Sequence, residues 1–105
     1  MPLRDKKLGL LISASPASPS FHHGIKLAQA ALDQGVSVYL YCIDDAVAGL
    51  ADVKLQALRA RGANLFACAY GAQRRDLPYN DLAIFAGLNM VGDLVANTDR
   101  FVSFN

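Results

Sequence analysis

A cysteine at a predicted junction between a strand and a helix is the strongest chemical signal in the sequence. Residues 65–68 predict a short apolar strand, and the chain from Ala69 to about Arg75 continues in helix-forming residues. Such a junction places the Cys68 thiol near the positive end of the helix dipole, which favours the thiolate form of the sulfur. Arg74 and Arg75 add positive charge if the helix brings them back toward that sulfur. A second interpretation is equally open: free cysteine is among the most buried residue types, so Cys68 could serve only for packing.

The same segment also has the spacing of a cysteine-phosphatase loop, because five residues separate Cys68 from Arg74. In those loops, backbone N–H groups surround a phosphate and the arginine holds two of its oxygens. Here Arg75 stands where Ser or Thr is usual, and Gly71 alone supplies flexibility to the loop. Phosphatase chemistry is therefore kept as a third hypothesis.

Two histidines and a second cysteine are the other residues that could carry chemistry. His22 and His23 fall in the first turn of a predicted helix, where the dipole disfavours the imidazolium form. They could deprotonate a thiol or contact a persulfide, or they could be exposed polar residues near a helix cap. Cys42 ends another predicted strand and is interpreted as packing, and Asp44-Asp45 after it as a solvated turn. The short paired spacing of a zinc site is absent, so no metal is predicted.

Alternating strands and helices must position these residues. Strands are predicted at residues 7–13, 36–42, 65–68 and 100–104, and helices at about 18–34, 52–61 and 69–75 and within 82–96. Ser18 or Ser20 is expected to cap the first helix, and Gly35 and Gly62 to end the first and second. This alternation predicts one α/β domain over residues 1–105, a small three-layer flavodoxin-like fold with a mostly parallel sheet of four to five strands.

In such sheets, ligands and reactive groups collect at the carboxyl ends of the strands. This rule brings together the Ser/Pro-rich loop before His22 and His23, the turn after Cys42, and Cys68. We expect the first strand to lie between the strands that end at the two cysteines. Two strand spacings are about 9–10 Å, beyond the ~7 Å between Cα atoms that a disulfide allows. The two cysteines are therefore not expected to pair.

Composition excludes several classes of function. The chain has 105 residues, 53% of them hydrophobic, and a net charge of +1, so nothing draws it strongly to nucleic acid or to an anionic membrane. No apolar stretch approaches the ~20 residues of a membrane span, and the run after the charged start is too short for a signal peptide, so we expect a cytoplasmic protein. The loop at 13–20 lacks the glycines and lysine of a nucleotide triphosphate site, and no cofactor is predicted.

Three segments resemble the DsrE/TusD family of small sulfur-relay proteins. The first is the opening strand and loop, Leu11–Pro16, with the alanine-rich helix that contains Lys26–Leu32. The second is the cysteine segment Cys68–Arg75, similar to the family's cysteine, small-residue helix and paired basic end. The third is the finish, Gly87–Phe104, with its Asp-Arg strand. Two departures are Asp76, where the family often has glycine, and a shorter middle of the chain.

The resemblance implies that Cys68 carries sulfur as a persulfide between donor and acceptor proteins. It implies supporting roles for Arg74 and Arg75, and we expect His22 and His23 to edge the mouth of the site. It also implies a homo-oligomer, a trimer or hexamer, or assembly with sister subunits. The wide apolar surface of the predicted helix within 82–96 is either deeply buried or meets another subunit. The alternative function is a non-catalytic structural subunit that binds a partner through this surface.

Overall fold

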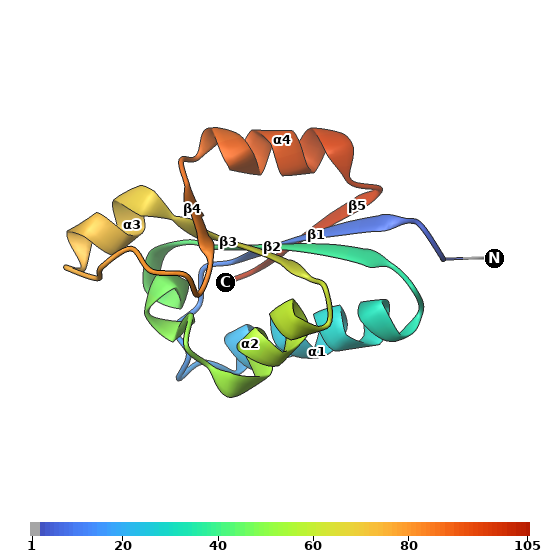
Figure 1. The fold of residues 1–105 in the computed structure, drawn as a ribbon, viewed down its shortest axis with the longest axis horizontal. Helices are drawn as coiled ribbons and strands as arrows, with labels where there is room; N and C mark the ends of the chain where they lie inside the picture. Colours follow the sequence, from blue (N-terminus) through green and yellow to red (C-terminus); the bar gives the residue numbers. More distant parts are fainter. Residues whose placement is uncertain (1–2) are drawn as a thin grey trace.

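The computed structural model describes residues 3–105 and consists of a five-stranded sheet with helices on both faces (Figure 1). The elements are β1 (Lys7–Ile12), α1 (Pro19–Asp33), β2 (Ser37–Cys42), the 3₁₀ helix η1 (Asp44–Gly49), α2 (Val53–Ala60), β3 (Asn64–Cys68), α3 (Ala69–Arg74), β4 (Ile84–Ala86), α4 (Asn89–Asn97) and β5 (Arg100–Phe104). All of the strand pairs are parallel. The predicted α/β, flavodoxin-like class is confirmed.

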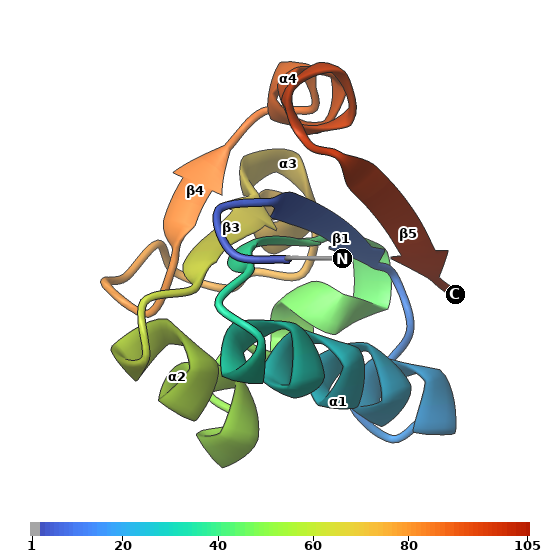
Figure 2. The same ribbon diagram turned by 90° about the vertical axis from the view of Figure 1, so that its right-hand side faces the viewer.

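The predicted order of the strands was wrong. The observed order is β4-β3-β2-β1-β5, so β2 pairs directly with β3. Helices α1 and α2 lie together on one face of the sheet, whereas α4 lies on the other (Figures 1 and 2). Successive right-handed crossovers that keep their helices on one face add strands in one direction, from β1 through β2 to β3. Only the crossover through α4 returns across the sheet, and it places β5 beside β1.

This order changes the reason why the two cysteines do not pair. Cys42 lies opposite Ala67 in the register of β2 and β3, and Cys68 is the next residue of β3. Side chains alternate between the faces of a sheet, so Cys42 and Cys68 point to opposite faces. Both cysteines are free, as predicted, but they are separated by the sheet itself and not by an intervening strand.

Local sequence signals set the ends of the first two helices. Ser18 caps α1, its side chain accepting a hydrogen bond from the N–H of Ser20, and Asp52 caps α2 in the same way. Gly35 and Gly62 follow these helices with φ of 79° and 106°, a left-handed conformation that glycine adopts without steric cost. The predicted boundaries of both helices are therefore confirmed.

The prediction that residues 82–96 are helical in part is confirmed by α4, but the inclusion of Ile84 and Phe85 in the apolar surface of that helix was wrong. Residues Ile84–Ala86 form β4, which pairs with β3, and the helix begins only at Asn89. A three-residue strand has little periodicity of its own, so its conformation is set by the neighbouring strand. The Asp44-Asp45 turn is also not a simple loop, because it opens η1.

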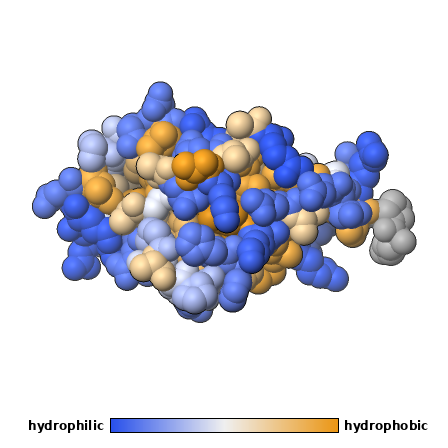
Figure 3. Space-filling model, turned by 90° about the horizontal axis from the view of Figure 1, so that it is seen from below, coloured by the Kyte–Doolittle hydropathy of each residue, from blue (hydrophilic) through white to orange (hydrophobic). Residues whose placement is uncertain are grey.

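The two faces of the sheet are covered unequally. On the side of α1 and α2, the sheet contributes Leu10, Ile12 and Leu40, none of which is exposed. The outer surface of α1 and α2 is mainly hydrophilic with smaller hydrophobic patches (Figure 3). On the other face, α4 buries only Leu94, while Val95 remains about half exposed. The sequence left open whether this helix is deeply buried or meets another subunit, and the exposure of Val95 excludes deep burial. No helix within residues 3–105 is long and apolar enough to cross a membrane.

Candidate functional site

Cys68 lies at the junction that the sequence predicted, as the last residue of β3 and the N-cap of α3. Its Sγ accepts a hydrogen bond from the backbone N–H of Gly71 at 3.3 Å. An N–H group at the start of a helix, aligned with the helix dipole, stabilises negative charge on the atom that it contacts. Only 2% of the Cys68 residue surface is exposed, so access to the sulfur depends on the surface immediately around it.

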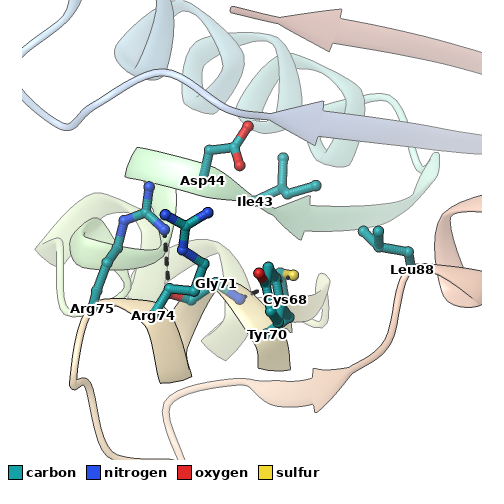
Figure 4. Close-up of a pocket in the computed structure, with 8 residues that line it drawn as sticks. All are labelled: Ile43, Asp44, Cys68, Tyr70, Gly71, Arg74, Arg75 and Leu88. Carbon is teal, nitrogen blue, oxygen red and sulfur yellow. Dashed lines mark hydrogen bonds between the residues drawn. The ribbon is translucent and has the colours of Figure 1, made fainter.

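That surface is a pocket of about 400 Å³ at the carboxyl ends of β2 and β3 (Figure 4). It is lined by Ile43, Asp44, Cys68, Tyr70, Gly71, Arg74, Arg75 and Leu88. Its size falls within the range of about 300–1,000 Å³ typical of small-molecule sites. The pocket therefore gives the otherwise buried sulfur access to solvent, as the carboxyl-end rule predicts.

Both arginines of the cysteine segment line this pocket, but they have different partners (Figure 4). Arg75 donates to the carbonyl oxygen of Gly71 at 3.2 Å and forms an ion pair with Asp45 at 3.1 Å. The guanidinium of Arg74 lies over the ring of Tyr70, 5.8 Å from its centroid, and makes no ion pair with a residue that the structure describes. Arg75 thus links α3 to η1 through its ion pair with Asp45. The charge of Arg74 is not neutralised by an ion pair with a residue that the structure describes.

Tyr41 lies against the site and was missed by the sequence analysis. It pairs with Phe66 in the register of β2 and β3, so its side chain is on the same face as Cys68, two residues further along. Its hydroxyl donates to the carbonyl oxygen of Ala86 at 2.9 Å, and Ala86 is the register partner of Cys68 on β4. Burial raises the pKa of the Tyr41 phenol, and the charge of the nearby Cys68 sulfur raises this pKa further. The phenol is therefore neutral and able to donate a hydrogen bond.

No local sequence signal marks Tyr41 as a site residue, because its position depends on the strand order. Asp45, the ion-pair partner of Arg75, was interpreted only as part of a solvated turn. Asp44 and Asp45 follow β2, and Arg74 and Arg75 follow β3. An ion pair between these two segments can be predicted once the two strands are known to be neighbours. Leu88, on the way from β4 to α4, is likewise brought to the pocket by tertiary structure alone.

Cys42 has the packing environment that was predicted for it. It is completely buried on the opposite face of the sheet, and this burial raises the pKa of its thiol to about 12. A thiol with so high a pKa contains almost no thiolate at neutral pH and is a poor nucleophile. Of the two thiols, Cys68 alone lines the pocket.

The two histidines are not brought to the sulfur. His22 lies in α1, where its Nε2 is 2.7 Å from the carbonyl oxygen of Pro16 and its ring packs edge-on against Phe21. His23 is exposed on the same helix. Neither residue lines the pocket at Cys68, so the expected position at its mouth was wrong. Among residues 3–105 there is no group of His, Cys, Asp or Glu side chains that could hold a metal ion.

The conformation of the cysteine segment also bears on phosphatase chemistry. The residues between Cys68 and Arg74 form the helix α3, so their N–H groups follow a helix axis and do not curve around one anion. One N–H group, that of Gly71, contacts the sulfur. The geometry therefore fits a sulfur that caps a helix better than a phosphate-binding loop.

Comparisons with known proteins relate the chain to others through its fold. No protein-family model matches the sequence, and a search of curated proteins finds no match. Among solved structures, the ychN protein from E. coli matches with a TM-score of 0.79 over 95% of this chain and 99% of that one, at 19% sequence identity. YchN has a DsrE-like fold, and a similarity of this extent shows that the present chain has the same fold.

Proposed function

We propose that this protein is a sulfur-relay protein that carries sulfane sulfur as a persulfide on Cys68. The observation that carries the proposal is the environment of the sulfur. The Cys68 Sγ caps α3, accepts the N–H of Gly71 at 3.3 Å and opens into a pocket lined by two arginines. A hydrogen-bond donor, a helix dipole and nearby cations all stabilise a sulfur anion, the form that attacks another sulfur. The DsrE-like fold supports the same assignment.

The proposed chemistry is two successive thiol-exchange steps with no net oxidation. The Cys68 thiolate attacks the terminal sulfur of a donor persulfide, R–S–SH. A bond forms between the Cys68 sulfur and the terminal sulfur, the bond within the donor persulfide breaks, and the donor leaves as a thiolate. An acceptor thiolate then attacks the outer sulfur of the Cys68 persulfide, takes it with its proton, and releases the Cys68 thiolate.

The shape and charge of the pocket set requirements on donor and acceptor. Because 2% of Cys68 is exposed, a partner has to insert its own sulfur into the pocket of about 400 Å³ to meet it. A persulfidated cysteine on an extended segment of a partner protein has the slender shape that this requires. Arg74, which lies over Tyr70 at the pocket, attracts the anionic form of that partner group.

Mass spectrometry of the intact and digested protein tests this function. After incubation with glutathione persulfide, the wild-type protein should carry one added sulfur on Cys68, and Cys42→Ala should behave in the same way. Cys68→Ser should gain no sulfur. Equal gain of sulfur by Cys68→Ser and the wild type would overturn the assignment.

The second candidate function, a non-catalytic interaction subunit, is favoured by the surface of β4 and α4. Ile84, Leu88 and Val95 are between 53% and 61% exposed, and several large exposed apolar side chains on β4 and α4 favour a protein contact there. A second copy of this chain, in a trimer or hexamer, or a sister subunit fits such a surface in either function. Sedimentation of the wild type and of Val95→Asp measures this assembly. A stable assembly together with a Cys68 that takes up no sulfur would favour the structural role.

A further inference from the structure

A second pocket, of about 490 Å³, lies at the other end of the sheet from Cys68. It is formed by the starts of β1 and β5 and the C-terminal half of α1, whereas the Cys68 pocket lies beside α3 (Figure 1). Leu8 and Arg100 are register partners here, so their side chains lie on the same face of the sheet. The lining residues are Leu3, Lys6, Lys7, Leu8, Leu27, Ala30, Ala31, Gln34, Val36, Asp99 and Arg100.

Apolar side chains make up more than half of this lining. Leu27, Ala30, Ala31 and Gln34 are three or four residues apart, so they lie on one side of α1. From Leu27 to Gln34 the helix makes two turns, a length of about 10 Å. Leu3 and Leu27 are 45% and 37% exposed, so the pocket is an apolar surface open to solvent. An aliphatic chain of medium length matches its extent.

Backbone hydrogen bonds hold the wall that Leu3 forms. The N–H of Lys6 donates to the carbonyl oxygen of Leu3 at 3.0 Å, and the N–H of Asp5 donates to the carbonyl oxygen of Gly35 at 3.3 Å. The segment before β1 is thereby attached to the turn after α1. The pocket is therefore formed before any ligand enters, which lowers the cost of binding.

The charged residues of the lining carry an excess of positive charge. Lys6, Lys7 and Arg100 line the pocket, and none of them forms an ion pair with a residue that the structure describes. Asp99 supplies the one carboxylate of this lining, and it accepts a hydrogen bond from the backbone N–H of Lys7 at 2.7 Å. Lysine and arginine lay their methylene groups along apolar surface and keep the charged end in water. The pocket thus combines an apolar body with a cationic rim.

We propose that this pocket binds a small amphipathic anion, an aliphatic chain of medium length that ends in one anionic group. The chain lies against α1, and the anionic group lies among Lys6, Lys7 and Arg100. The volume is within the range of about 300–1,000 Å³ typical of small-molecule sites. A second copy docked symmetrically through this surface would bring like charges together, which disfavours that occupant. The site is separate from Cys68 and does not depend on the proposed function.

Three probes of equal chain length test the proposal on the wild-type protein. Octanoate, octanol and octylamine are titrated below their micelle concentrations into ¹⁵N-labelled protein. We expect octanoate to bind most tightly, with amide shifts at Leu8, Leu27 and Ala31 and none at Cys68. Octanol or octylamine binding as tightly as octanoate would overturn the proposal, as would octanoate shifts confined to the residues around Arg74.

Substitutions of exposed residues separate the charge from the apolar contact. Lys6→Gln combined with Arg100→Gln should weaken octanoate binding by about tenfold, roughly threefold for each exposed charge, and leave octanol binding unchanged. Lys54→Gln combined with Arg59→Gln removes the same charge from α2, outside the pocket, and should change neither affinity. Leu27→Ala should weaken both ligands by similar factors. Octanoate binding that is equal in the two charge variants would overturn the proposal.

Sedimentation distinguishes a ligand site from a contact between copies of this chain. Octanoate should leave the sedimentation coefficient of the wild type unchanged, and so should Leu27→Asp. An assembly that octanoate or Leu27→Asp dissociates would identify a second copy as the occupant and overturn the proposal. Loading of Cys68 with sulfur, measured in the same samples, is expected to be independent of octanoate, so the two proposals fail separately.

Discussion

Replacing Cys68 with alanine or with serine should separate its structural role from its chemical one. The side chain caps α3 through the 3.3 Å contact with the N–H of Gly71, and 2% of the residue is exposed. Alanine removes both the cap and a buried sulfur. Loss of an N-cap costs about 1 kcal/mol, and loss of a buried group the size of a methylene about 0.8 kcal/mol. Cys68→Ala should therefore lower the free energy of unfolding by about 2 kcal/mol.

Serine keeps an acceptor at the same position and is among the preferred N-cap residues. Cys68→Ser should be more stable than Cys68→Ala by about 1 kcal/mol, although neither variant can carry sulfur. Urea unfolding at neutral pH, followed by circular dichroism, measures both changes, and unchanged m-values would show that the extent of unfolding is the same. If Cys68→Ala were as stable as Cys68→Ser, the reasoning from the Gly71 contact would be refuted.

Three further predictions concern the surroundings of the site. Burial raises the pKa of Cys42 from 9.0 to about 12, so its contribution to stability is complete below about pH 9 and is lost as the pH rises through 12. The free energy of unfolding, measured with urea, should therefore fall between pH 8 and pH 10 by about 1 kcal/mol less in Cys42→Ala than in the wild type, and equal falls would contradict this. A methyl group at Gly49 would lie 2.6 Å from Pro16, so Gly49→Ala should destabilise the fold by about 1–3 kcal/mol, whereas Gly92→Ala, in an open part of α4, should stabilise it in the same unfolding assay. The exposed pair of Arg75 and Asp45 should show a coupling of about 0.2–1 kcal/mol in a double-mutant cycle that weakens at high salt, and a larger, salt-independent coupling would argue against a surface ion pair.

The features that the sequence predicts correctly are those set by neighbouring residues. The position of Cys68 between β3 and α3 follows from an apolar run that changes into helix-forming residues. The cap at Ser18 follows from the preference of its side chain for backbone N–H groups at helix starts, and Gly35 and Gly62 end the first two helices as predicted. The α/β class follows from the alternation of such elements.

The features that the sequence does not predict depend on which elements become neighbours. A right-handed crossover can place the next strand on either side of the sheet, depending on the face that its helix covers, and β3 lies on the side that we did not predict. The predicted strand order concealed the position of Tyr41 on the same face of the sheet as Cys68, and it concealed the ion pair of Asp45 with Arg75. The short edge strand β4, held by its pairing with β3, was concealed for the same reason.

We propose that the Cys68 sulfur both accepts a sulfur atom and gives it up. The most direct test loads the protein with isotopically labelled sulfur from glutathione persulfide, removes the donor, and follows the label by site-resolved mass spectrometry after dithiothreitol is added. We expect the label to appear on Cys68 alone and then to leave to the added thiol, which returns the free Cys68. A label that never appears on Cys68, or that appears equally on the buried Cys42, would contradict it.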